Sequence, residues 1–172
     1  MKKILKITTY LLSFLILGLG LFLGVKILLP QHPTETSQVQ NFQKNQAKLE
    51  TLRQQIALNA KDSATLDVKT IQNKEESLLK ELGILWISLK PSGEIDLVTS
   101  KGGFYFTDSL MGYYYSEKTP QNIYECDPQK YPQEPVKSLE TFFKEYSSIE
   151  CVYRVYRPLG GAWYLYYERV EF

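Results

Sequence analysis

The amino-acid sequence predicts an α+β fold in which a small antiparallel sheet domain with one helix follows a transmembrane helix and an amphipathic helical stalk or helix pair. Three observations predict this arrangement. Residues 7–29 form an apolar run, and residues 39–82 repeat apolar side chains mostly at three- and four-residue steps, as an amphipathic helix does. Residues 83–172 hold twelve of the thirteen tyrosines, five phenylalanines and both tryptophans, and aromatic residues favour strands.

The apolar run from Ile7 to Leu29 predicts a transmembrane signal anchor. At about 1.5 Å per residue its 23 residues reach roughly 34 Å, which exceeds the roughly 30 Å hydrocarbon core of a bilayer. Pro30 closes the run. The alternative is a secretory signal that is cleaved, for which residues 18–20, with the sequence Gly-Leu-Gly, are the best small-residue site.

Basic residues before the run predict its orientation. Lysines that flank a span are retained on the cytoplasmic side, and the chain begins with Lys2, Lys3 and Lys6. We therefore expect residues 1–6 to form a cytoplasmic tail at the inner, or cytoplasmic, membrane. The bulk of the chain is then expected to be extracytoplasmic or periplasmic, with the membrane as its first partner.

Residues 30–38 predict a linker, because they combine two prolines with small polar residues and show no apolar periodicity. The amphipathic stalk follows over residues 39–82. Asp62 or Ser63 is a candidate start for a second helix, so one long helix and two helices both stay open. The apolar stripe consists of Val39, Phe42, Leu49, Leu52, Ile56, Ala60, Ala64, Val68, Ile71, Leu78 and Leu82.

The stripe of residues 39–82 needs a surface to cover it. The chain's own distal domain, a coiled coil with a second copy and a partner's helix are the three alternatives. We expect a protein partner or a homo-oligomer through residues 39–82, although Gln46, Asn59 and Glu75 interrupt a coiled-coil seam. Nucleic acid is excluded as a partner, because residues 31–172 carry 16 basic and 19 acidic side chains with the signs interspersed.

The aromatic-rich segment 83–172 predicts the order ββββ-loop-α-ββ in a compact antiparallel domain. The predicted strands are 84–89, 95–99, 104–107 and 113–116, followed by a loop over 117–135, a helix from Pro135 to Tyr146, and a hairpin of 149–156 and 162–172. The first hairpin is expected to place Leu85, Ile87, Leu89, Ile95 and Leu97 on one face, and Glu94 and Asp96 on the other.

Cys126 and Cys151 are the only two cysteines of the chain. In an oxidising compartment an even number of cysteines predicts one disulfide. Two buried free thiols and one reactive thiol are the alternatives. A catalytic thiol needs a histidine base, and the single histidine, His32, falls in the predicted linker.

No motif in the sequence specifies a reaction, so we expect a protein that is not an enzyme and has no cofactor or metal site. Glu94 and Asp96 share a strand face, which is more typical of a solvated face than of paired acid–base carboxylates. Residues 101–103, Lys-Gly-Gly, predict a hairpin connection, because no glycine-rich loop enters a helix there. Metal-ligand spacing is absent, with one histidine and no paired-cysteine motif.

Tyrosines on both faces of two strands predict an interaction surface. Side chains alternate along a strand, so some rings of residues 113–115 and 164–167 are expected outside the core, where rigid amphipathic rings suit recognition. Two arginines near the C-terminus either join this surface as a basic-aromatic patch or form a solvated strand face, and the solvated face is favoured. The candidate residues are Tyr113, Tyr114, Tyr115, Tyr164, Tyr166, Tyr167, Arg154 and Arg157.

These observations lead us to expect a single-pass, membrane-anchored assembly or scaffolding component of an envelope complex. The alternative is a stalk-borne module that binds a glycan, peptide or small molecule. An N-terminal apolar helix, an antiparallel sheet and a disulfide near the C-terminus are also similar to the layout of type IV pilins and pseudopilins, which implies a filament subunit as a minor alternative. The chain departs from the pilin signature, because residues 1–10, MKKILKITTY, contain no glutamate and the first glutamate is Glu35.

Overall fold

The structure, a computed structural model, describes residues 32–62, 73–104, 107–146 and 151–171. The predicted tail and transmembrane segment, residues 1–6 and 7–29, lie outside these ranges. Within them, no helix is both long and apolar enough to cross a membrane.

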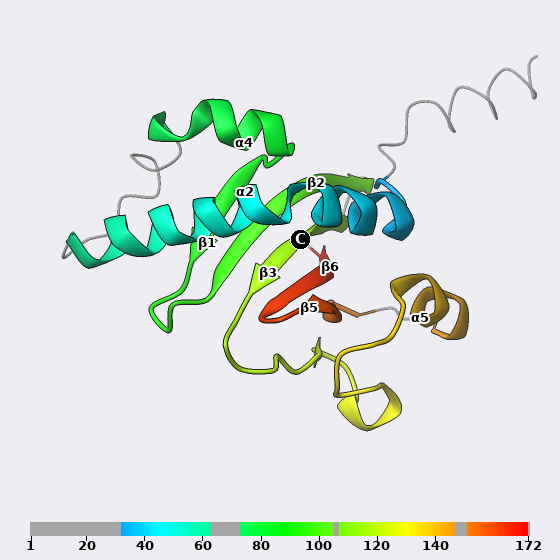
Figure 1. Cartoon of the computed structure of the whole chain (residues 1–172). Coiled ribbons are helices and arrows are strands. Elements are labelled where there is room, and N and C mark those ends of the chain that lie inside the picture. Colours follow the sequence, from blue (N-terminus) through cyan, green and yellow to red (C-terminus); the bar gives the residue numbers. More distant parts are fainter. Residues whose placement is uncertain (1–31, 63–72, 105–106, 147–150, 172) are drawn as a thin grey trace, which may run out of the picture. The chain divides into compact units, whose positions relative to one another are not determined.

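The described residues form an α+β fold of one six-stranded antiparallel sheet and three α-helices (Figure 1), which confirms the predicted class. The strand order in the sheet is β1-β2-β3-β6-β5-β4. The strands are β1 (Trp86–Leu89), β2 (Ile95–Phe104), β3 (Thr107–Tyr115), β4 (Ile123–Tyr124), β5 (Tyr153–Gly160) and β6 (Trp163–Glu171). The helices are α2 (Glu35–Asp62), α4 (Glu76–Leu82) and α5 (Leu139–Glu145), with a 3-10 turn η1 (Pro128–Lys130).

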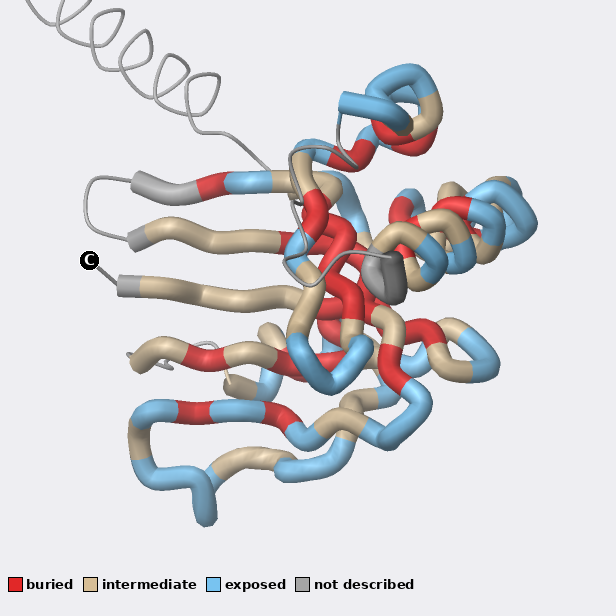
Figure 2. Tube along the Cα trace, turned by 90° about the vertical axis from the view of Figure 1, so that its left-hand side faces the viewer, coloured by how far each residue is buried: buried red, intermediate tan, exposed pale blue. Residues whose placement is uncertain are grey.

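The two faces of the sheet follow from the alternation of side chains along each strand. The face toward the helices carries the main core, and we call it the helix face; the other carries a second cluster, and we call it the tyrosine face. Figure 2 shows the buried positions gathering where strands and helices meet. The helix face includes Ile87, Leu89, Ile95, Leu97, Tyr113, Val155 and Leu165, and the tyrosine face includes Val98, Tyr114, Tyr156, Tyr164 and Tyr166.

The apolar stripe of α2 packs against this sheet. Phe42, Leu49 and Leu52 are buried in the main core, and so is Ile56 one turn further on. Of the three alternatives for the stripe, the structure thus shows packing on the chain's own domain. In the described part of residues 39–82 lie α2, which begins at Glu35 within the predicted linker, and α4; residues 63–72 are outside the described ranges.

Several predicted strand boundaries are wrong, chiefly because glycines do not end the second strand. Gly102 and Gly103 lie inside β2 and pair with Ser109 and Asp108 of β3, so residues 101–103 are not a connection. Of the predicted strand 104–107, Phe104 ends β2, Thr107 begins β3, and residues 105–106 lie outside the described residues. The predicted strand 113–116 overlaps the second half of β3, which ends at Tyr115. The loop predicted over 117–135 contains the short strand β4.

The predicted disulfide between Cys126 and Cys151 is confirmed. The two Cα atoms are 5.8 Å apart, within the usual range for a bridge. The bond joins the segment just after β4 to the segment just before β5, and both half-cystines pack against the main core. It therefore encloses η1 and α5 within one covalent loop.

Candidate functional site

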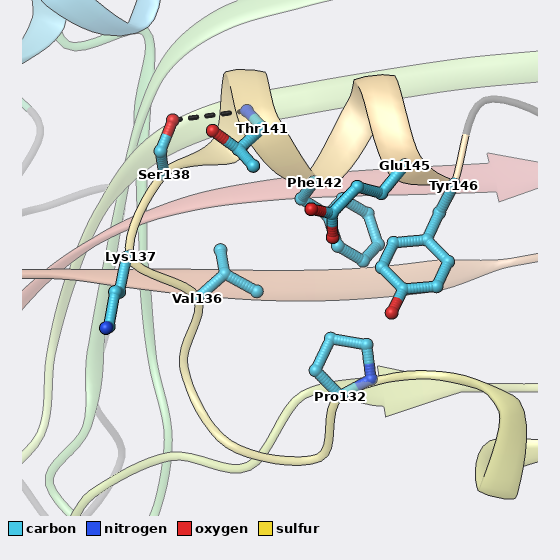
Figure 3. A pocket seen from close by; sticks show the side chains of 8 residues that line it. All are labelled: Pro132, Val136, Lys137, Ser138, Thr141, Phe142, Glu145 and Tyr146. Carbon is cyan, nitrogen blue, oxygen red and sulfur yellow. Dashed lines mark hydrogen bonds between the residues drawn. The ribbon is translucent and has the colours of Figure 1, made fainter.

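Helix α5 has a pocket on each of its two sides. The first pocket, which we call the Tyr146 pocket, has a volume of about 370 Å³ (Figure 3). The second, which we call the His32 pocket, has a volume of about 400 Å³. Both volumes lie in the lower part of the range of roughly 300–1,000 Å³ that is usual for ligand sites. The lining of the Tyr146 pocket is Pro132, Val136, Lys137, Ser138, Thr141, Phe142, Glu145 and Tyr146.

The wall of the Tyr146 pocket is fixed by one buried amide, that of Asn122. Its side-chain nitrogen donates to the carbonyl oxygens of Pro132, at 2.9 Å, and Glu134, at 2.6 Å. Its Oδ1 accepts from the backbone N–H of Tyr156, at 2.9 Å, and the N–H of Val136 donates to the carbonyl of Tyr156, at 2.7 Å. The irregular segment 132–136 is thereby held against β5.

Aromatic rings form the floor and one wall of the Tyr146 pocket. The ring centroids of Phe142 and Tyr146 are 5.1 Å apart, and Tyr131 meets Tyr146 edge to face at 5.6 Å. In Figure 3 the rings of Phe142, Tyr146 and Pro132 surround the hollow, and Glu145 lies at its rim. The site offers an apolar floor, a phenol hydroxyl and a carboxylate.

The His32 pocket is built around the only histidine. His32 Nδ1 lies 2.8 Å from Ser100 Oγ and Nε2 lies 2.6 Å from Ser109 Oγ, so β2 and β3 hold both ring nitrogens. Its ring also meets that of Tyr167 edge to face, with centroids 5.4 Å apart. Burial lowers the pKa of His32, which favours the neutral imidazole.

Sequence analysis missed the His32 pocket, because it assigned His32 to a linker. The pocket cannot be recognised in the sequence, because Ser100 and Ser109 follow His32 by 68 and 77 positions and meet it only in the folded chain. In a neutral imidazole one ring nitrogen donates and the other accepts, so the two serine hydroxyls complete both hydrogen bonds. This arrangement fixes the orientation of the ring.

Glu35, in the first turn of α2, connects three elements beside the His32 pocket. Its Oε1 is 2.6 Å from Arg157 Nη1 on β5. Its Oε2 accepts hydrogen bonds from the Ser138 hydroxyl, at 2.9 Å, and from the backbone N–H of Glu140, at 2.7 Å. The carboxylate therefore caps the start of α5 and joins that helix to α2 and β5.

Most of the tyrosines predicted to form an interaction surface are buried. Tyr113 lies in the main core and donates through its hydroxyl to the Gln38 carbonyl oxygen. Only two of the six predicted rings are half-buried, and both pack against the main core. The four buried tyrosines are Tyr113, Tyr114, Tyr164 and Tyr166, and the two half-buried ones are Tyr115 and Tyr167.

The two predicted arginines lie on opposite faces of the sheet, and the expectation of a solvated strand face is wrong for Arg154, whereas Arg157 is half-buried. Arg157 pairs with Glu35, as described above. Arg154 lies on the tyrosine face, where its side chain is 11% exposed and forms an ion pair with Asp96 and a longer one with Glu168. The expectation of a solvated Asp96 is wrong too, because its side chain is only 9% exposed.

Comparisons with known proteins identify no family for this chain. The chain matches no protein-family model, no curated protein and no solved structure. In the described ranges no group of three or more histidine, cysteine, aspartate or glutamate side chains is arranged to hold a metal ion. The inference of function therefore rests on the two pockets of α5 and on the chemistry of their linings.

Proposed function

We propose that this chain is a single-pass, membrane-anchored extracytoplasmic protein and a non-enzymatic assembly component of an envelope complex. In this proposal the Tyr146 pocket receives an apolar side chain of a partner protein. The proposal rests on the Tyr146 pocket, which has an aromatic floor and lies between α5 and segment 132–136. This part of the chain is enclosed by the disulfide.

The lining of the Tyr146 pocket resembles the anatomy of protein interfaces. Its centre is apolar, with Val136, Phe142 and the Tyr146 ring, and its exposed rim carries Lys137 and Glu145. Interfaces concentrate aromatic anchors in a desolvated centre and place charged groups at the edge. The disulfide and the Asn122 hydrogen bonds hold the walls in place before a partner arrives, which lowers the entropic cost of binding.

The proposed partner contact is the Tyr146 pocket and not the apolar stripe of residues 39–82. Residues 39–82 were expected to bind a partner through their apolar stripe, but α2 uses that stripe in the main core. A contact through residues 39–82 remains a prediction that would need the exposed polar side of α2, where Gln40 and Gln43 lie. The Tyr146 pocket provides the apolar area that such a side lacks.

Site-specific photocrosslinking in native membranes tests this proposal. The full chain is made with a photoreactive phenylalanine at Lys137 or Thr141, at the pocket, or at Gln43 on the exposed side of α2. We expect the same crosslinked partner from both pocket positions and none from Gln43. Mass spectrometry of the crosslinked species identifies the partner.

A variant with a filled pocket tests whether the crosslinks depend on the Tyr146 pocket. Val136→Trp places a larger side chain in the hollow and keeps the backbone N–H that bonds Tyr156. Crosslinks from Lys137 should then be lost, while the disulfide still forms on a non-reducing gel. A partner captured from Gln43 alone would assign the interaction to α2 and contradict the pocket as the site. Crosslinks that persist in Val136→Trp would contradict it as well.

A further inference from the structure

The His32 pocket differs in chemistry from the Tyr146 pocket, and nothing in the proposed function uses it. Its lining combines apolar groups with acidic ones and contains no lysine or arginine. The lining residues are His32, Pro33, Thr34, Glu35, Thr36, Met111, Leu139, Glu140, Phe143 and Tyr167.

Three aromatic rings form a corner in this pocket. Phe143 and Tyr167 meet edge to face, with centroids 4.8 Å apart and planes at 71°. His32 and Tyr167 also meet edge to face, with planes at 76°. All three side chains are half-buried, so part of each ring is accessible to solvent. Rings at steep angles to one another present more than one π face to the same small volume.

The lining carries two carboxylates, Glu35 and Glu140, and Glu35 is paired with Arg157 beside the pocket. Glu140 lies at the exposed end of the pocket, and its ion pair with Lys144, at 3.3 Å, joins two side chains that are 67% and 75% exposed. Such a surface pair is weak, so the Glu140 carboxylate is available to a ligand. The imidazole of His32 is neutral near pH 7 because burial lowers its pKa, and it adds no positive charge.

We propose that the His32 pocket binds an alkylammonium group. A cation placed over the faces of aromatic rings is attracted by their quadrupoles, and aromatic corners of this kind recognise quaternary ammonium ligands. The Glu140 carboxylate adds a Coulombic attraction from the rim. An anionic ligand is disfavoured by the same two features, and a neutral one gains only the apolar contact.

Two sources of an alkylammonium group are distinguishable. One is a free amine, and the other is an amine-bearing lipid headgroup. His32 follows Leu29, the end of the predicted span, by three residues, which reach at most about 11 Å when extended. The lipid source rests on the membrane anchor proposed above, whereas binding of a free amine does not.

The test uses the full chain in lipid nanodiscs and compares choline with 3,3-dimethylbutan-1-ol, a neutral molecule of the same shape. Binding is followed by NMR of labelled methionine and phenylalanine, which report on Met111 and Phe143. We expect choline to bind roughly 2- to 30-fold more tightly than the neutral analogue, the range of a cation–π contribution. Equal affinities for the two probes, or no binding of choline, would overturn the proposal.

Variants locate the site. Phe143→Leu removes one half-buried ring, and Glu140→Gln removes the rim charge without touching the core; each should reduce choline binding but not binding of the neutral analogue. Glu125→Gln, an exposed acid outside the pocket, is the matched control and should change neither. Choline binding that survives both pocket variants would place the cation elsewhere and contradict the assignment.

The lipid arm compares nanodiscs that hold the same fraction of phosphatidylglycerol and whose remaining lipid is either phosphatidylethanolamine or an uncharged glycolipid without an amine, so that the anionic surface concentrates choline equally in both. A weaker apparent affinity for choline in the nanodiscs with phosphatidylethanolamine would show competition by the headgroup amine and assign the lipid source. An unchanged affinity would assign a free amine. Either result is consistent with an alkylammonium site in the His32 pocket. Neither tests partner binding by the Tyr146 pocket, so each proposal can be contradicted without the other.

Discussion

The guanidinium carbon of Arg154 lies 4.1 Å from the centroid of the Tyr166 ring, on the tyrosine face of the sheet. Arg154 is on β5, and its partner Asp96 is on β2, with β6 and β3 between them. In a flat sheet, strands three places apart are separated by about 14 Å. The arginine therefore crosses two strands, and it lies over the rings of Tyr114 and Tyr156 as well as Tyr166.

Breaking the Arg154–Asp96 pair should strongly destabilise the fold. Asp96→Ala leaves the Arg154 guanidinium, nearly enclosed by rings, with only its longer pair to Glu168, and loss of a partner from a buried ion pair costs up to about 3–5 kcal/mol. The free energy of unfolding, measured by urea titration in detergent, should fall by that order. Lys48→Met, which removes the exposed pair of Lys48 with Glu81, is the control and should change it by less than about 1 kcal/mol. Similar losses in the two variants would mean that Arg154 contributes no more than a surface charge.

Gly112 of β3 should not tolerate a side chain. A Cβ at this position would lie 2.2 Å from the Leu97 carbonyl oxygen and 2.8 Å from the Val98 Cα, and both are backbone atoms of the paired strand. Gly112→Ala should therefore lower the free energy of unfolding by about 1–3 kcal/mol, because β2 and β3 must separate locally. Gly102→Ala is the comparison, since its closest neighbours are side-chain atoms of His32 and Ser109 and not the backbone of a paired strand. A larger loss in Gly102→Ala than in Gly112→Ala would contradict this explanation.

Loss of the disulfide should destabilise the domain without unpairing the sheet. The bridge joins residues 25 positions apart, and the chain-entropy relation gives about 3.5 kcal/mol for a loop of that size. Cys126→Ser and Cys151→Ser should each lower the free energy of unfolding by about that amount, and the double variant by no more. Losses that add in the double variant would mean that each cysteine acts through its own packing instead.

His32 should make the stability of the domain depend on pH. Its pKa in the folded protein is below the ordinary value of 6.5, so the unfolded chain binds more protons as pH falls below 6.5. The contribution of His32 is complete above that pH and is lost as the pH falls toward the lowered pKa. The melting temperature should fall more in the wild type than in His32→Gln between about pH 7.5 and about pH 5. Parallel pH profiles for the two proteins would refute the effect.

Local patterns in the sequence predicted most of the first hairpin's faces and the apolar stripe of α2. The exception is Leu85, which was expected on the apolar face but is 56% exposed, while Ile84 is buried in the main core. Ile87, Leu89, Ile95 and Leu97 share the helix face as expected from a period of two, while Asp96 takes the other face. Phe42, Leu49 and Leu52 are buried as expected from a period of 3.6. These features depend on near neighbours in the chain, which is why the sequence reveals them.

Features that depend on strands distant in sequence could not be predicted. Asp96 has the pattern of a solvated residue, and only the pairing of β3 with β6 and of β6 with β5 brings Arg154 within its reach. The burial of the tyrosines could not be predicted for the same reason. The sequence pattern of the tyrosine face is polar, but its side chains are closely packed in the structure. Burial raises the pKa of Tyr156 there to about 12, which keeps its hydroxyl neutral beside the carboxylates.

The last strand of the chain, β6, lies between β3 and β5 and pairs with both. During synthesis, β1, β2 and β3 can form a three-stranded unit from neighbouring residues, but β4 and β5 have no strand pairing with that unit until residues 163–171 emerge. The sheet is therefore completed from its middle, after the strands on both sides have been made. A chain that stops before Trp163 carries two unjoined halves with unpaired strand edges, the kind of surface that aggregates or is removed by proteases.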